Sequence, residues 1–205
     1  MQAWNGEWEQ IPGKKVSQVL VRYGVAALNE RYASSFLGQW SNAVIMQIAV
    51  IGAADCTPEE YSAAQDVGCL IAGNHETLIC GGMGGVMEAA CKGAKEQGGR
   101  TVGILPDMGD GNPYLDVRVR SGMGYSRNVV LVQSADAVIA IGGKYGTLSE
   151  IAIALKLKKP VFGYKTWDID GVFNCATPEE TVVMAVRAAR LSPSYRNPPD
   201  GKGLP

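Results

Sequence analysis

The sequence contains a single histidine, His75, among its 205 residues. A Ser-His-Asp triad or a histidine-rich metal site therefore has almost nothing to draw on. His75 stands just before an apolar run that predicts a strand, so we expect a surface or strand-cap role for it. We predict no metal site.

Cysteine lacks the spacing of a disulfide scaffold or a zinc site. The chain has an odd number of cysteines and no C-x-x-C pair; they are Cys56, Cys69, Cys80, Cys91 and Cys175. Disulfide-rich secreted domains do not have this pattern. We expect reduced thiols that are mostly buried, as in a cytoplasmic protein.

Neither sign of charge is in excess. The 19 basic and 20 acidic side chains give a formal charge of −1, and no basic stripe marks a nucleic-acid interface. No apolar run is long enough to cross a bilayer, and the N-terminus lacks a signal-peptide pattern. We therefore expect no nucleic-acid partner and no membrane partner.

Glycine is abundant, with 26 residues, and many of them follow short apolar runs. These runs predict strands, and helical patterns with helix-start signals such as Thr57-Pro58-Glu59-Glu60 and Thr177-Pro178-Glu179-Glu180 separate them. The predicted strands are 46–51, 76–80, 100–105, 115–119, 136–141 and 160–164, and the predicted helices are 58–72, 86–97, 124–134, 147–157 and one that begins after Thr177.

This alternation predicts an α/β fold with a mainly parallel sheet that is covered by helices on both faces. The continuous apolar character of the strands agrees with burial on both faces. We assign residues 46–191 to this domain. Residues 1–45, with three of the four tryptophans, form an N-terminal extension of uncertain structure, and the proline-rich residues 192–205 form a flexible tail.

Two glycine-rich loops follow predicted strands, at the sheet edge where such folds bind ligands. The first loop leads into a helix, whose free amides and positive dipole end suit a phosphate. Alternatively, its glycines only make a tight turn and let the helix pack near the sheet. The loop is not a dinucleotide fingerprint, because Met87 stands where the third glycine belongs. Its predicted ligand-binding residues are Gly81, Gly82, Met83, Gly84 and Gly85.

The second loop follows the strand predicted at 136–141. Thr147 is predicted to cap the next helix or to donate its hydroxyl to a phosphate. Glu150, three residues later, fits the capping-box alternative. Arg127 and Asn128 begin a helix near the same edge, so that Arg127 and Glu150 would place a cation and a carboxylate beside both loops. The predicted ligand-binding residues here are Asn128, Gly142, Gly143, Lys144, Tyr145, Gly146 and Thr147.

The pattern Gly142-Gly143-x-x-Gly146-Thr147-x-x-Glu150, with Arg127-Asn128 upstream, resembles the LOG-type Rossmann family, which includes cytokinin-activating phosphoribohydrolases. The runs CGGMGGVMEAACKGA and RNVVLVQSADAVIAIGGKYGTLSEIAIALKLKKPV are similar to its molybdenum-cofactor-carrier-like branch. This resemblance covers residues 46–190. It implies a Rossmann-like three-layer αβα sandwich, a homodimer or larger homo-oligomer, and a phosphate held by both loops.

In the hydrolase branch, the motif arginine and glutamate cleave a nucleoside 5′-monophosphate into free base and ribose 5-phosphate. Arg127 and Glu150 fill these positions as the implied catalytic residues. A carboxylate would stabilise the positive charge that develops on the ribose ring, and the arginine would grip a phosphate or the departing base. The chain departs from the hydrolases at Ile141, where they usually have proline, and its first loop is shorter.

Three functions remain open at the level of sequence. The first is binding of a phosphorylated nucleotide-like or pterin-like small molecule, with the molybdenum cofactor or a nucleotide as ligand and with no cofactor required. The second is hydrolysis of a nucleoside 5′-monophosphate. The third is a nucleotide-sensing regulatory module that docks a partner through the tryptophan-rich N-terminus.

Overall fold

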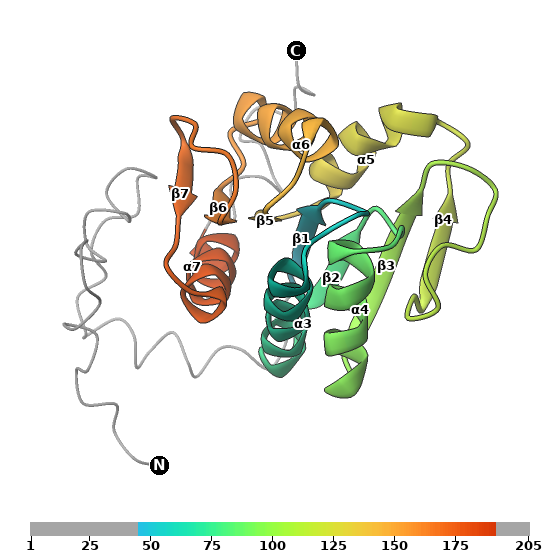
Figure 1. Cartoon of the computed structure of the whole chain (residues 1–205), viewed down its shortest axis with the longest axis horizontal. Coiled ribbons are helices and arrows are strands. Elements are labelled where there is room, and N and C mark those ends of the chain that lie inside the picture. The colour runs from blue at the N-terminus through green and yellow to red at the C-terminus, as the bar shows by residue number, and fades with distance from the viewer. Residues whose placement is uncertain (1–44, 192–205) are drawn as a thin grey trace. The chain divides into compact units, whose positions relative to one another are not determined.

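A computed structural model describes residues 45–191, which form a seven-stranded sheet between two layers of helices (Figure 1). Every pair of neighbouring strands is parallel, and the strand order is β4-β3-β2-β1-β5-β6-β7. The predictions for residues 1–44 and 192–205 lie outside the described residues. The strands are β1 (Gln47–Gly52), β2 (Thr77–Cys80), β3 (Arg100–Leu105), β4 (Val117–Arg120), β5 (Ala137–Ile141), β6 (Val161–Tyr164) and β7 (Val172–Asn174).

Helices cover both faces of the sheet, which confirms the predicted Rossmann-like αβα sandwich. On one face α3 (Pro58–Gly73) packs against α4 (Val86–Glu96) and α7 (Pro178–Leu191); on the other, α5 (Arg127–Ser134) packs against α6 (Tyr145–Lys156). The short 3-10 helix η3 (Gly124–Ser126) precedes α5. None of the helices within residues 45–191 has the length and apolar character that a membrane span requires.

The described chain enters the sheet at its central strand β1 and extends the sheet in two directions. From β1 it passes through β2 and β3 to the edge strand β4, and it then returns to place β5 on the other side of β1. The carboxyl ends of β2, β1 and β5 are therefore neighbours at one edge of the sheet. This reversal of direction is where open parallel sheets bind ligands.

The central strands are apolar along their whole length because helices bury both of their faces. All five residues of β5 are buried, as are the four inner residues of β1. The largest fully buried side chain is that of Phe162 in β6. This rigid core holds the strand ends, and the loops that follow them, in fixed positions.

Two local predictions are wrong. The strand predicted at 160–164 is not the last one, because β7 follows it; with three residues, β7 is too short to give a clear pattern. Helix α6 begins at Tyr145 and not at Thr147, since Gly142 (φ 50°) and Gly143 (φ 104°) complete the turn early. The N-cap is Lys144, without a side-chain cap, so Thr147 is not the cap and no capping box with Glu150 forms.

Candidate functional site

Three loops meet at the carboxyl edge of the sheet, after β1, β2 and β5. The Val86 amide at the start of α4 donates to the Ala53 carbonyl after β1, at 3.0 Å. On the other side, Lys144 after β5 forms an ion pair with Asp55 at 3.2 Å. Both glycine-rich loops thus lie at one edge, as expected, with the β1 loop between them.

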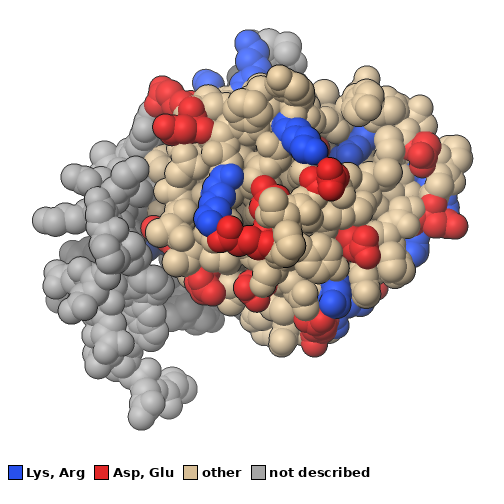
Figure 2. Space-filling view, in the orientation of Figure 1, with Lys and Arg blue, Asp and Glu red and all other residues tan. Residues whose placement is uncertain are grey.

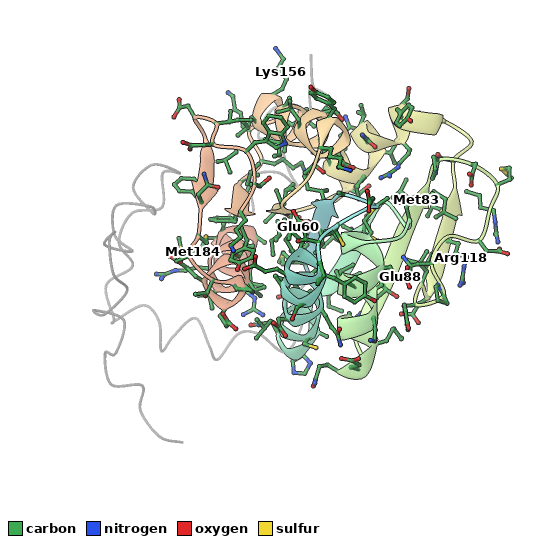
Figure 3. All side chains as sticks on the ribbon, in the orientation of Figure 1. Glu60, Met83, Glu88, Arg118, Lys156 and Met184 are labelled. Atoms are coloured by element: carbon green, nitrogen blue, oxygen red, sulfur yellow. The ribbon has the colours of Figure 1, made fainter. Side chains whose placement is uncertain are left out.

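The turn after β1 uses its own side chains to satisfy the start of α3. Thr57 and Glu60 form a capping box, in which the Glu60 amide donates to Thr57 Oγ1 and the Thr57 amide donates to Glu60 Oε2. The Glu60 carboxylate also lies against Gly142, where an added Cβ would come within 1.7 Å of Glu60 Oε1. Figure 3 shows Glu60 at the end of α3 that faces the tip of β1. A phosphate would find occupied amides and a negative charge here.

Arg127 and Glu150 come together behind the first glycine loop. Arg127 opens α5 and Glu150 lies in α6; their side chains meet at 3.4 Å (Nη1 to Oε1), and the two residues are only 8% and 5% exposed. The Arg127 guanidinium also fills the space beside Gly81, since an added Cβ there would lie 2.2 Å from Nη2. Residues from the loop after β2, from α5 and from α6 therefore converge, with Arg127 and Glu150 beside the first glycine loop.

The ion pair between Arg127 and Glu150 compensates neither group fully. Burial raises the pKa of Glu150 to about 7, and the nearby charge of Arg127 opposes that rise only in part. Arg127 Nε is buried and has no hydrogen-bond partner among the described residues. A buried guanidinium with an unused donor is costly unless an acceptor reaches it. The arrangement can accept an anion, and Glu150 can exchange a proton near neutral pH.

Two buried thiols lie under the first glycine loop. The sulfur atoms of Cys80 and Cys91 are 3.5 Å apart, and Cys80 Sγ accepts a hydrogen bond from the Gly82 amide at 3.3 Å. The hydrogen bond between the two thiols lowers the pKa of Cys80. The same bond, together with burial, raises the pKa of Cys91. Both side chains are fully buried, in agreement with the expected packing role.

Not every predicted contact residue offers a free amide. The Gly82 amide is taken by Cys80, and the Gly142 amide donates to the Tyr164 carbonyl at 3.1 Å. Asn128 donates from Nδ2 to Ser149 Oγ at 3.0 Å and so ties α5 to α6. Any contact from these three residues to a ligand would have to use other atoms.

The start of α6 offers the donors of the second loop. The amides of Tyr145, Gly146 and Thr147 stand in the first helical turn, where no helical carbonyl can accept from them. The Thr147 side chain is buried against Gly143, where an added Cβ would lie 2.4 Å from Thr147 Oγ1. Tyr145 projects outward and packs on Trp167, with ring centroids 6.3 Å apart.

Sequence reasoning missed Asn112, which lies in the connection between β3 and β4. Its amide donates to the Gly82 carbonyl at 2.8 Å, and its Nδ2 donates to the Met83 carbonyl at 3.1 Å. The only sequence signal is an asparagine before a proline in a polar loop, and that pattern is common in turns. Asn112 nevertheless holds the first glycine loop in place.

Within residues 45–191, no three His, Cys, Asp or Glu side chains are grouped to hold a metal ion. Basic and acidic side chains are interspersed on the described face in Figure 2, and neither sign forms a continuous patch there. Any anion site on this face must therefore be local and depend on backbone amides and single side chains.

The described region is similar to known proteins in sequence and in structure. The sequence profile of the SLOG cluster4 family matches residues 45–191. An uncharacterized protein of Archaeoglobus fulgidus is 52% identical over 140 residues, which cover 67% of this chain and 93% of that protein. The molybdenum cofactor binding protein from Rippkaea orientalis is 34% identical with a TM-score of 0.67, over 72% of this chain and 98% of that chain. The molybdenum cofactor carrier protein from Chlamydomonas reinhardtii is 33% identical with a TM-score of 0.64, over 70% and 98%.

Proposed function

Because this chain belongs to the SLOG cluster4 family, we propose that it binds a phosphorylated nucleotide-like or pterin-like small molecule at the carboxyl edge of its sheet. The observation that carries the proposal is the buried Arg127, which lies against Gly81 with one donor unused. Two similar structures are of proteins described as binding or carrying the molybdenum cofactor. That cofactor, or a nucleotide, would be cargo or ligand here.

The phosphate would lie between the two glycine loops. Backbone amides of Met83, Gly84 and Gly85 would donate from the first loop, and those of residues 144–147 from the start of α6. Arg127 would add the fixed positive charge that a phosphate pairs with strongly. The self-capped turn after β1 would stay outside the phosphate site.

Hydrolysis of a nucleoside 5′-monophosphate is a second candidate, favoured by the raised pKa of Glu150 beside Arg127. In that reaction the bond between the base nitrogen and C1′ breaks, water supplies the hydroxyl on C1′, and the base leaves with a proton. Glu150 would stabilise the positive ribose or take the proton from water. Arg127 would hold the phosphate or donate to the leaving base.

Binding of AMP, ribose 5-phosphate and adenosine, measured by isothermal titration calorimetry, tests the proposal. We expect AMP and ribose 5-phosphate to bind and adenosine to bind far more weakly. Arg127→Ala should weaken phosphate binding about tenfold to a hundredfold, because it removes a charge-assisted contact. The matched control is Arg118→Ala, which removes a half-buried arginine of β4 whose Nε donates to the Asp110 carbonyl. If no phosphorylated probe binds, or if both arginine variants bind alike, the proposal is wrong.

Free base released from AMP, measured by chromatography, separates the hydrolase from the carrier. Release that disappears in Glu150→Gln while binding persists would identify an enzyme. Binding of AMP without release of free base would support the carrier function. The sensor hypothesis depends on Trp4, Trp8 and Trp40, which all lie outside the described residues.

We also propose a homo-oligomer in the cytoplasm. The exposed Val117 and Val119 of the edge strand β4 support self-association. Light scattering after size exclusion would give the oligomer size, and a monomer at all concentrations would contradict this proposal.

A further inference from the structure

We propose that Asn112 is a positioning residue for the ligand site, which it serves by turning the amides of Met83 and Gly84 toward the ligand. This inference rests on the proposed function, and it adds a residue from the β3–β4 connection to a site otherwise built from β2, α4, α5 and α6. Asn112 does not have to touch the ligand to act in this way.

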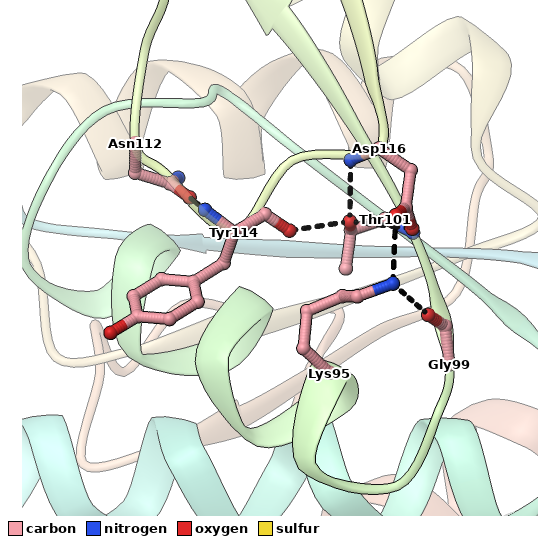
Figure 4. Close-up of polar contacts among 6 residues, drawn as sticks. All are labelled: Lys95, Gly99, Thr101, Asn112, Tyr114 and Asp116. Atoms are coloured by element: carbon pink, nitrogen blue, oxygen red, sulfur yellow. Dashed lines mark hydrogen bonds and ion pairs between the residues drawn. The ribbon is translucent and has the colours of Figure 1, made fainter.

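All the polar groups of the Asn112 side chain are engaged. Nδ2 donates to the Met83 carbonyl at 3.1 Å. Oδ1 accepts from the Tyr114 amide at 3.1 Å, as Figure 4 shows. The backbone amide of Asn112 donates to the Gly82 carbonyl at 2.8 Å. Asn112 is 5% exposed, so water competes little for these bonds.

The two captured carbonyls determine where the following amides point. All described peptide bonds are trans, and in a trans peptide the C=O and N–H vectors are antiparallel. The Gly82 carbonyl shares a peptide with the Met83 amide, and the Met83 carbonyl shares one with the Gly84 amide. Both amides therefore point away from Asn112 and the β3–β4 connection.

The side away from Asn112 is the side on which a ligand could bind. On the near side, Gly82 is packed against Leu105, where an added Cβ would lie 2.3 Å from Leu105 Cδ2. Met83 is exposed, so a ligand can reach this side of the loop. The Glu88 carboxylate, with Oε2 3.7 Å from an added Cβ at Gly84, has to turn away from the loop when an anion binds. Two donors are thus held ready on an accessible loop, and their alignment needs no further ordering when an anion arrives.

A second polar cluster anchors the far end of the same connection without touching the glycine loop. Lys95 Nζ pairs with Asp116 at 2.7 Å and donates to the Gly99 carbonyl, while Thr101 Oγ1 donates to the Tyr114 carbonyl at 2.7 Å (Figure 4). A variant here loosens the connection but leaves the bonds from Asn112 in place. Lys95→Met is therefore the matched control.

The test compares Asn112→Asp, Asn112→Ala and Lys95→Met with the wild-type protein. Ribose 5-phosphate and AMP are titrated by calorimetry, and stability is followed by urea unfolding. We expect both Asn112 variants to bind ribose 5-phosphate about tenfold more weakly, because each loses the Nδ2 donor to the Met83 carbonyl that aligns the Gly84 amide. Lys95→Met should lower stability and leave affinity unchanged.

The affinity of Asn112→Asp should recover at low pH, which a loss of stability alone would not produce. A buried carboxyl has a raised pKa, and its protonated form again carries a donor for the Met83 carbonyl. The affinity gap between Asn112→Asp and the wild type should therefore narrow from pH 8 to pH 5, whereas the gap for Asn112→Ala should stay constant.

Nuclear magnetic resonance of the ligand-free protein separates this inference from the proposed function. The Gly84 amide should shift and become more mobile in Asn112→Asp but not in Lys95→Met, and the Met83 amide should change less because the Asn112 backbone amide still holds the Gly82 carbonyl. If the wild type binds neither probe, the proposed function fails while the amide signals still test the role of Asn112. Unchanged loop amides, or equal losses of affinity and stability in Asn112→Asp and Lys95→Met, would overturn the inference.

Discussion

Burying Glu150 has a cost that depends on pH. Its pKa is raised to about 7 by burial, against the opposing charge of Arg127. Between about pH 4.5 and 7 the folded protein holds a proton that the unfolded chain has already released, so the free energy of unfolding falls as pH rises across this window. Below it both states are protonated, and above it both are ionised.

Glu150→Gln should remove this pH dependence. Because the carboxyl is nearly fully buried, the raised pKa corresponds to roughly 3 kcal/mol of unfolding free energy between pH 4.5 and 8. We expect the stability of the variant relative to wild type to improve by about this amount across that range. Urea unfolding at several pH values measures it, and parallel curves for the two proteins would contradict the assignment.

At the scale of elements, α3 and α7 begin with the same four residues, Thr-Pro-Glu-Glu. In each helix the threonine hydroxyl accepts from the amide three residues later, at 3.2 Å for both Thr57 and Thr177. Both helices start at the carboxyl edge of the sheet, but α3 follows the central strand β1 beside the candidate site, whereas α7 follows the edge strand β7. The same threonine cap can therefore be removed once beside the candidate site and once away from it.

Thr57→Ala and Thr177→Ala should each cost about 1 kcal/mol of stability, the usual value for a lost threonine cap. Neither should change the affinity for ribose 5-phosphate, because α3 uses its first amides for its own capping box. Urea unfolding and calorimetry on the same samples check both points. Weaker binding in Thr57→Ala alone would place the turn after β1 inside the phosphate site.

For the whole molecule, the position of the first glycine loop depends on how closely α4 lies against α3. Two glycines allow this approach: an added Cβ at Gly68 would come within 1.9 Å of the Ala90 carbonyl oxygen, and one at Gly93 within 1.9 Å of that of Gln65. Any larger residue would force the helices apart. Since α4 carries the loop at its N-terminus, this would also move the loop.

Gly93→Ala should therefore destabilise the protein by about 2 kcal/mol or more and also weaken ribose 5-phosphate binding. Gly73→Ala is the control, because nothing lies within 4 Å of an added Cβ there and its φ is not positive. It should stabilise the protein by about 0.5 kcal/mol through the unfolded chain. Equal effects of the two substitutions, in thermal or urea unfolding, would contradict the close crossing.

Much of the fold follows from local pattern. Apolar runs predict six of the seven strands, and the Thr-Pro-Glu-Glu sequences predict the starts of α3 and α7 to the residue. Strand β7 and the start of α6 were missed because three residues carry no period, and because the turn at Gly142 and Gly143 is shaped by Glu60 and Thr147, which pack against those glycines. Such contacts leave no local signal.

By itself, the sequence determined the alternation of helices with six of the seven strands, the parallel sheet and the edge at which both glycine loops lie, because these depend on periodicity and chain direction. Only the tertiary structure decided that Arg127 lies against Gly81, that burial gives Glu150 a pKa of about 7, and that Asn112 orients the first loop. These features depend on burial and on contacts between residues up to 46 positions apart, such as Gly81 and Arg127. Desolvation and close packing exist only once the chain has folded.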